Sequence, residues 1–325
     1  MSGTAVLVEE GPDTGLLWHR GSPFAEQKAF EQGAAIIELA RGGIIEVSGP
    51  DRLEWLNSLS TGRFGELQPG QGLEALLLSP TGHVQHLLRA VEDGERLWLS
   101  SDAHDATAVF DYLASMRFRT KVQVVAHPEL SLRWVGAQLT GERGLPEPVA
   151  PAVPAPFGPG TLQIGAVGQP GPDDERMAGM WAWHAERIAA GVPKIGVDTD
   201  ERTLPNELGL YATALDKGCY CGQETVARVH NLGRPPRRLV RLLLDGSTSE
   251  IPGIGSAIGY EGHDVGRIGA TAIHHEDGPI ALGLVTRSIP VDAQFAIAGV
   301  PAAQEALVDP DIGLHVKPAH LLRRR

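Results

Sequence analysis

Short apolar runs separated by turn residues fill the last third of the chain, and they restrict its fold more than any other feature. Beyond residue 238, Gly, Asp and Pro turns separate the runs LVRLLL, AIGYEG, VGRIGATAI, IALGLVTRSI and FAIAG. Short runs bounded by turn signals are typical of strands in all-β barrels. We therefore predict a small β-barrel over residues 239–325.

The first part of the chain, residues 1–143, mixes predicted helices and strands. Ser22 is placed to cap a helix that has Pro23 at its first position and Gly33 just past its end. We then expect two strands in AIIELARGGIIEVSG, a helix in PDRLEWLNSLSTG and an antiparallel meander over residues 74–101. A helix in DAHDATAVFDYLASMRFR and the strands KVQVVAHP and LSLRWVGAQL complete an α+β region.

Proline and glycine then dominate residues 144–172. The segments EPVAPAVPAPFGPG and GQPGPDD suit a loop or linker better than a core. A second α+β region, residues 173–238, opens with a predicted helix in DDERMAGMWAWHAERIAAG and carries both cysteines of the chain. The expected fold is therefore α+β, with a C-terminal barrel.

Charge and composition narrow the possible partners. The formal net charge is -12 and the pI is about 5.4, which argues against a standing nucleic-acid or anionic-membrane surface. The N-terminus lacks the basic start and apolar run of a leader, and no apolar stretch approaches the ~20 residues of a membrane helix. We expect a cytoplasmic protein with no direct nucleic-acid or membrane partner.

The two cysteines lie one residue apart in DKGCYCGQETVARVHNLGRPPRR, residues 216–238. They are too close to close a useful disulfide loop, so reduced thiols are expected. A closed zinc or iron–sulfur site needs four ligands, and no second cysteine pair exists, so we expect no metal site. Lys217 and Arg228, together with the glycines on either side of the cysteine pair, favour a reactive thiol. The alternative is that the cysteines are two small buried residues in a tight turn.

The motif K-G-C-Y-C-G-Q-E, residues 217–224, resembles the signature of the YgfZ family of folate-binding proteins. That family is related to the T protein of the glycine cleavage system, an aminomethyltransferase. The segments TVAR (225–228), RIAAGVP (187–193) and LPNE (204–207) share the resemblance, and IIEVSGPDRLEWLN (44–57) is similar to the opening of the folate-binding domain. The resemblance covers most of the chain except the proline-rich stretch.

This resemblance implies a ring-like fold around a central hole that binds tetrahydrofolate or a one-carbon derivative of it. It implies a role in maintaining iron–sulfur enzymes, including those that modify tRNA, with iron–sulfur proteins or assembly factors as partners. We expect the protein to be a monomer. Cys219 is the family's thiol, with Lys217 tuning or orienting it, and Cys221 occupies a variable position. The implied folate contacts are Glu207 for the pterin, Arg238 (or Arg237) for the carboxylate tail, and Tyr220, Gln223, Glu224 and Arg228 of the motif.

Each assignment has a structural alternative. Glu207 could simply cap a helix, Arg237 and Arg238 could form a solvated turn, and Gln223 and Glu224 could only fasten the motif turn. His274 and His275 are expected at an exposed hairpin tip beside EDG.

Three functions therefore stay open. The first is a folate-dependent accessory protein, the second a one-carbon transferase or demethylase, and the third a thiol-based cluster carrier. The T protein has an acidic pair where this chain has Gln85 and His86. The missing carboxylate favours the accessory role, although His86 could act as a weaker acid or base.

Overall fold

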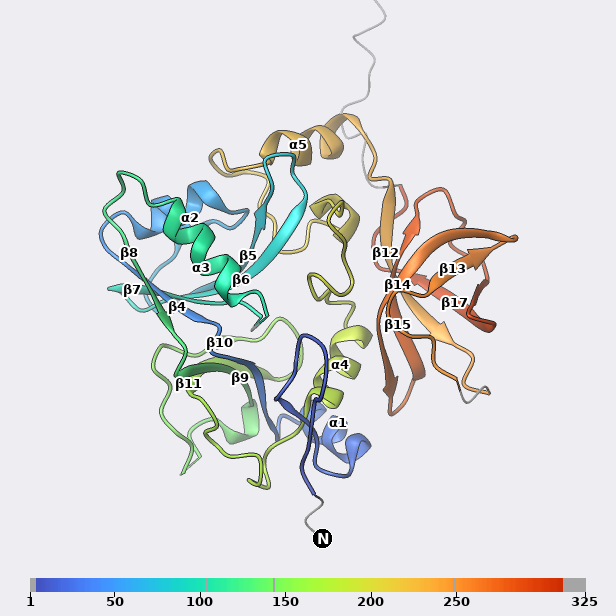
Figure 1. The fold of residues 1–325 in the computed structure, drawn as a ribbon, viewed down its shortest axis with the longest axis horizontal. Helices are drawn as coiled ribbons and strands as arrows, with labels where there is room; N and C mark the ends of the chain where they lie inside the picture. Colours follow the sequence, from blue (N-terminus) through green and yellow to red (C-terminus); the bar gives the residue numbers. More distant parts are fainter. Residues whose placement is uncertain (1–3, 103, 143, 248–249, 312–325) are drawn as a thin grey trace, which may run out of the picture.

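The computed structural model describes residues 4–102, 104–142, 144–247 and 250–311 of the chain. Within these ranges the strands form a five-stranded sheet, a four-stranded sheet, a closed barrel and a two-stranded ribbon of β1 (Val6–Leu7) and β2 (Leu17–His19). Figure 1 shows the two sheets on one side of helix α4 (Met180–Ala189) and the barrel on the other. The predicted α+β fold with a barrel is confirmed.

The five-stranded antiparallel sheet contains the predicted meander. Its order is β5-β6-β7-β4-β8, and its strands are β4 (Ile44–Ser48), β5 (Gly72–Leu78), β6 (Val84–Glu92), β7 (Arg96–Ser100) and β8 (Gln123–His127). Helices α2 (Arg52–Leu59) and α3 (Ala106–Ser115) cover one face, because their apolar residues join alternate strand residues in one buried cluster. A short helix η1 (Phe64–Glu66) follows α2.

The four-stranded sheet has the order β10-β11-β9-β3 and packs against α1 (Pro23–Glu31) and α4. Its strands are β3 (Ile36–Arg41), β9 (Leu130–Gly136), β10 (Val153–Pro154) and β11 (Gly160–Ala166), and η2 (Ala137–Leu139) follows β9. The loop or linker predicted over residues 144–172 is therefore wrong in part. Strand β11 pairs with β9 along its whole length, and its Leu162 and Ile164 are buried. The surrounding prolines conceal this alternation in the sequence.

Six strands close the barrel in the order β12-β15-β14-β13-β16-β17. They are β12 (Arg237–Leu244), β13 (Ala257–Tyr260), β14 (His263–His274), β15 (Gly278–Thr286), β16 (Phe295–Ile297) and β17 (Val300–Ala306). Residues 312–325 of the predicted barrel range lie outside the described residues. The β14–β15 turn is where the sequence predicts it, but the exposed position expected for His274 and His275 is wrong: 7% and 5% of their side chains are exposed. Both side chains face α1 and α4, which pack against this end of the hairpin.

The segment between α4 and the barrel is mostly irregular. It contains η3 (Pro205–Leu208) and α5 (Gln223–Leu232), and α5 follows the two cysteines directly. Helix α4 begins at Met180, later than predicted, because turns occupy residues 172–176.

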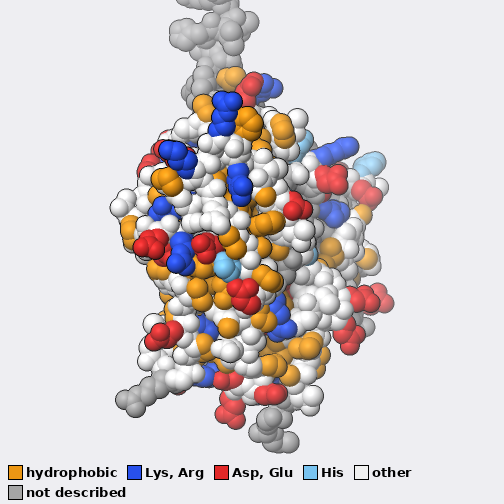
Figure 2. Space-filling view, turned by 60° about the vertical axis from the view of Figure 1, so that its left-hand side comes forward, with side chains coloured by type: hydrophobic (Ala, Val, Ile, Leu, Met, Phe, Trp, Pro, Cys, Tyr) orange, Lys and Arg blue, Asp and Glu red, His pale blue; other side chains and the backbone are white. Residues whose placement is uncertain are grey.

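No helix among the described residues has both the length and the apolar character needed to cross a bilayer. On the face drawn in Figure 2, acidic and basic side chains are interspersed.

Candidate functional site

Lys217 fastens the cysteine motif to the end of helix α2. Its Nζ donates to the backbone carbonyls of Asn57 at 2.6 Å, Ser60 at 2.7 Å and Gly62. These bonds use all three donors of the ammonium group. Burial lowers the pKa of Lys217 to about 8. The structure therefore gives Lys217 an anchoring contact.

Tyr220 anchors the same loop on its other side. It is buried in an apolar cluster with Leu78, and its ring centroid lies 5.1 Å from Lys217 Nζ. Burial raises its pKa to about 12. Between these two anchors Cys219 is exposed, while Cys221 is half-buried, and both are free thiols. The alternative of two buried cysteines in a tight turn is therefore wrong for Cys219.

Gly222 allows the motif loop to touch the β5–β6 turn. It has a φ of +80°, and a Cβ there would lie 2.7 Å from the carbonyl oxygen of Ser79 and 2.8 Å from Cα of Gly82. Both the left-handed conformation and the close approach exclude a side chain. Helix α5 begins at the next residue, Gln223, which is half-buried.

Glu224 and Arg228 form an i,i+4 ion pair on the surface of α5. Their side chains are 87% and 65% exposed, and the Nη2–Oε1 distance is 2.7 Å. They face solvent, so the structure does not bring them together with Glu207 in one buried site.

Glu207 is fully buried, and its carboxylate accepts four hydrogen bonds. Oε1 accepts from the backbone N–H and the Nε of Arg237 at 3.1 and 2.8 Å. Oε2 accepts from the backbone N–H of Leu204 and from Arg237 Nη2, both at 2.9 Å. A carboxylate has about four acceptor positions, so all those of Glu207 are in use. The bond to Leu204 caps η3, as the structural alternative predicts.

The neighbouring arginines lie on opposite sides of strand β12. Arg237 binds Glu207 and also Asp200, with its Nη1 2.6 Å from Oδ2 of that aspartate. Arg238 is only 1% exposed and donates to Oε1 of Gln304 at 2.8 Å and to the carbonyl of Ile289 at 2.9 Å. A solvated turn is therefore wrong for both residues. Arg238, the preferred partner for a carboxylate tail, is enclosed on the barrel side.

A partly buried polar group that the sequence did not reveal joins β5, β6 and the segment before the motif. Arg89 Nε lies 3.1 Å from Glu74 Oε1, and the hydroxyl of Tyr211 donates to the other oxygen of Glu74. Arg89 Nη1 lies 3.4 Å from Asp102. Against the cost of burial, these carboxylates hold the pKa of Arg89 above its ordinary value. The signal in the sequence is an arginine inside the apolar strand run LLRAV.

This group borders a cavity of about 330 Å³ between the two sheets. Glu74, Arg89, Ser100, Leu132, Val153 and Ala212 are among the residues that line it. The hydroxyl oxygen of Ser100 is buried and has no hydrogen-bond partner. The cavity is therefore mostly apolar with a few converging polar groups, as small-molecule sites usually are.

His86 lies near this region, on β6. Its Nδ1 is 3.2 Å from Oδ2 of Asp105, the residue that precedes α3. Gln85 donates to the carbonyl of Val84. An imidazole beside a carboxylate thus occupies the strand where the T protein resemblance leads us to expect an acidic pair.

A search against protein-family models found no match. Among curated proteins, the chain is 25% identical to a chloroplast protein of Arabidopsis thaliana, At1g60990, which is named as a transferase; the alignment covers 80% of this chain and 67% of that protein. It is 32% identical to the human mitochondrial iron–sulfur cluster assembly factor IBA57, over 53% of this chain and 52% of the relative. It is 33% identical to the tRNA-modifying protein YgfZ of Aliivibrio fischeri, over 35% of this chain and 38% of the relative. The chain thus spans about half the length of the human relative and less of YgfZ.

The structural comparison covers more of the chain. The glycine cleavage system aminomethyltransferase T from Bartonella henselae superimposes with a TM-score of 0.79 at 19% identity, over 94% of each chain. This likeness establishes the fold, and the sequence matches add the YgfZ and IBA57 relatives. The chain therefore has the aminomethyltransferase fold and is similar in part of its sequence to YgfZ and IBA57.

Proposed function

We propose that this protein binds tetrahydrofolate, or a one-carbon derivative of it, and serves iron–sulfur cluster assembly or repair through the thiol of Cys219. Relatives named as an iron–sulfur assembly factor and as a tRNA-modifying protein support the process. The fold of an aminomethyltransferase supports a folate ligand. Iron–sulfur proteins or their assembly factors are the partners that this role requires.

The exposure of Cys219 on an anchored loop carries the proposal. Lys217 and Tyr220 fasten the loop at two points, and the thiol between them is free and exposed. A cysteine retained for packing would be buried, since free cysteine behaves as a small apolar residue. A thiol held at the surface by fixed neighbours is available to a metal cluster or to a partner protein.

The folate site is better supported at Glu74 than at Glu207. A reduced pterin presents an amide-like edge that a carboxylate reads by accepting two hydrogen bonds. Glu207 has no acceptor position left, whereas Glu74 accepts one bond from Arg89 and one from Tyr211. Glu74 also borders the 330 Å³ cavity, together with Ser100 and its unpartnered hydroxyl. The buried Arg238 does not suit the carboxylate tail in this conformation.

Tetrahydrofolate titration of the purified protein, with Glu74→Gln and Glu207→Gln as a matched pair, tests this proposal. We expect binding to the unaltered protein and a loss of about 1–3 kcal/mol of binding free energy in Glu74→Gln only. A loss confined to Glu207→Gln would place the pterin at Glu207, as the family resemblance implies, with Arg237 displaced. No binding to the unaltered protein would overturn the folate part of the proposal.

One-carbon transfer is the second candidate, because His86 lies beside Asp105, and an imidazole next to a carboxylate is the arrangement that general acid–base catalysis commonly uses. The relative named as a transferase is consistent with it. Folate-dependent one-carbon transfer that disappears in His86→Ala would favour this activity over the accessory role. A brown anaerobic preparation would instead favour a cluster carrier.

A further inference from the structure

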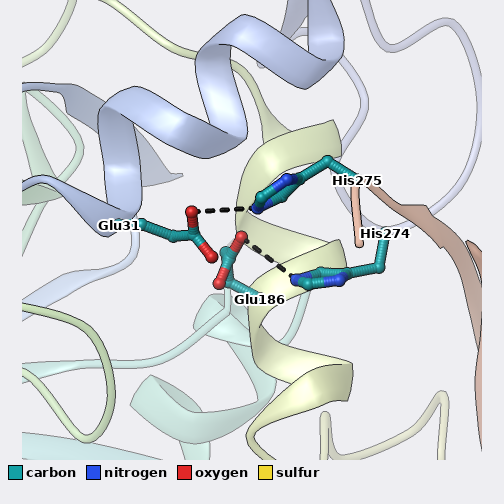
Figure 3. Close-up of side chains that lie close together, drawn as sticks. All are labelled: Glu31, Glu186, His274 and His275. Atoms are coloured by element: carbon teal, nitrogen blue, oxygen red, sulfur yellow. Dashed lines mark ion pairs between the residues drawn. The ribbon is translucent and has the colours of Figure 1, made fainter. Parts of the chain in front are cut away.

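Two glutamates and two histidines from three separate elements meet outside the site described above (Figure 3). Glu31 is the last residue of α1, and Glu186 lies on α4. His274 ends strand β14, and His275 follows it in the turn. One donor atom of each residue lies within 4.8 Å of the corresponding atoms of the other three. The sequence alone predicts an exposed hairpin tip for these histidines and no metal site.

Two donor atoms in this group are buried without a hydrogen bond. Nε2 of His275 and Oε1 of Glu186 have no hydrogen-bond partner, and the side chain of His275 is 5% exposed. The ring of His275 points toward Glu31, with Nε2 2.9 Å from Oε2, in a geometry that does not make a hydrogen bond. Buried donors and acceptors without partners are uncommon and costly, so their convergence points to a missing ligand.

The tautomer of His274 determines which of its ring nitrogens faces the carboxylate of Glu186. Its Nδ1 accepts from the backbone N–H groups of Glu276 at 3.3 Å and Asp277 at 3.1 Å. In the neutral ring the proton is therefore on Nε2, which faces Oε1 of Glu186 at 3.5 Å. At this distance the two atoms make no hydrogen bond, but His274 is placed to orient Glu186 once the carboxylate turns toward a metal ion, as partners of metal-binding carboxylates commonly do.

Gln27 holds the histidine segment in place. It is fully buried, and its amide donates to the carbonyl of Ile273 at 2.9 Å and accepts from the backbone N–H of His275 at 2.8 Å. This clamp fixes the end of β14 against α1. The backbone at His275 is therefore held in place by the fold itself.

The charge of the group favours a cation. Among the described residues, the ion pairs of Glu31 and Glu186 are with histidines only, and no lysine or arginine neutralises them. Glu31 is 38% exposed, which leaves a route from solvent.

We propose that Glu31, Glu186 and His275 bind a divalent transition-metal ion of the Zn²⁺ class, with His274 positioning Glu186. Zinc bonds of about 2.0–2.2 Å place tetrahedral ligands ~3.3 Å apart, which the flexible glutamates reach by small rotations. Three protein ligands leave a coordination position for water or another donor. One imidazole nitrogen selects against Mg²⁺ and Ca²⁺, which prefer oxygen ligands alone. The ion would join α1, α4 and the barrel.

Zinc titration of chelator-treated protein tests the proposal, with Cys219→Ser/Cys221→Ser included because thiols also bind zinc. We expect one Zn²⁺ per chain in both proteins and a higher Tm on binding. Affinity should fall about 100-fold or more in His275→Ala and in Glu31→Gln, since even outer partners of metal ligands contribute 10–100-fold. Co²⁺ should give the visible absorption of a low-coordinate site, and this signal should vanish in His275→Ala.

Glu276→Gln and His263→Ala are the matched controls, because both residues are exposed and neither belongs to the group. They should bind Zn²⁺ as the unaltered protein does. If His275→Ala fails to fold, Glu31→Gln, at the exposed end of a helix, decides the question. Zinc binding that disappears with the two cysteines, or that persists unchanged in both His275→Ala and Glu31→Gln, would overturn the proposal.

Discussion

Lys217 Nζ lies 2.6 Å from the carbonyl oxygen of Asn57, although 160 residues separate the two in sequence. With the carbonyls of Ser60 and Gly62, this contact joins the cysteine motif to the C-terminal end of helix α2. Three backbone acceptors thus meet one cation, and that cation holds the loop that carries Cys219.

Lys217→Met should lower the free energy of unfolding by about 1–3 kcal/mol, because it leaves partly buried carbonyls without a donor. It should also make Cys219 more mobile. Urea denaturation measures the first effect, and the spectrum of a spin label on Cys219, in a chain with Cys221→Ser, measures the second. Lys121→Met, at an exposed position, is the control, and equal stability of the two variants would show that the anchor is not needed.

Cys219 should react faster with an alkylating reagent than Cys221, because it is exposed and Cys221 is half-buried. Peptide mass spectrometry over a time course measures both rates in one sample. Cys219→Ser should abolish complementation of an iron–sulfur maintenance defect without changing the fold or folate binding. Cys221→Ser should have little effect, and full complementation by both variants would leave the motif without a functional thiol.

Glu207→Gln should lower the free energy of unfolding by about 3 kcal/mol, since it breaks a buried ion pair and leaves the guanidinium of Arg237 partly uncompensated. Thermal and urea unfolding measure this loss. Glu224→Gln breaks an exposed pair and should cost less than 1 kcal/mol, which makes it the matched comparison. A similar small effect for both would mean that the Glu207 cluster contributes specificity rather than stability.

Stability should decrease as the pH falls below about 6.5, in part because of His184. Burial lowers the pKa of this imidazole below its ordinary value of 6.5, against the opposing effect of the hydrogen bond to Asp13. The unfolded chain then binds a proton before the folded chain does, so the free energy of unfolding falls with falling pH. His184→Gln should show a shallower decrease between pH 7 and 5, whereas equal slopes would contradict this origin.

Local patterns in the sequence predict most of the secondary structure. The Pro23 helix, the β5–β6–β7 meander and the barrel strands all follow from apolar periodicity and from Pro and Gly at element ends. Strand β11 was not predicted because its own glycines and the prolines around it resemble those of a linker, and pairing with β9 makes it a strand. Tertiary pairing overrides a weak local preference here.

The sequence also determined the motif and the family resemblance, including the position of Cys219 between Lys217 and the glycines. Which side chains face one another was decided by tertiary structure. Adjacent strand residues point to opposite sides, so the register of β12 sends Arg237 to Glu207 and encloses Arg238 in the barrel.

Long-range packing explains the two groups that the sequence did not reveal. Tyr211 and Glu74 are 137 residues apart, and Gln27 bonds to a residue 248 positions away, so no window of the sequence contains either site. Buried polar groups must find partners, and only the folded chain brings those partners within reach. Local sequence thus specified the helices and strands and the place of Cys219 in its motif. Tertiary packing assembled the cavity and the histidine–glutamate group.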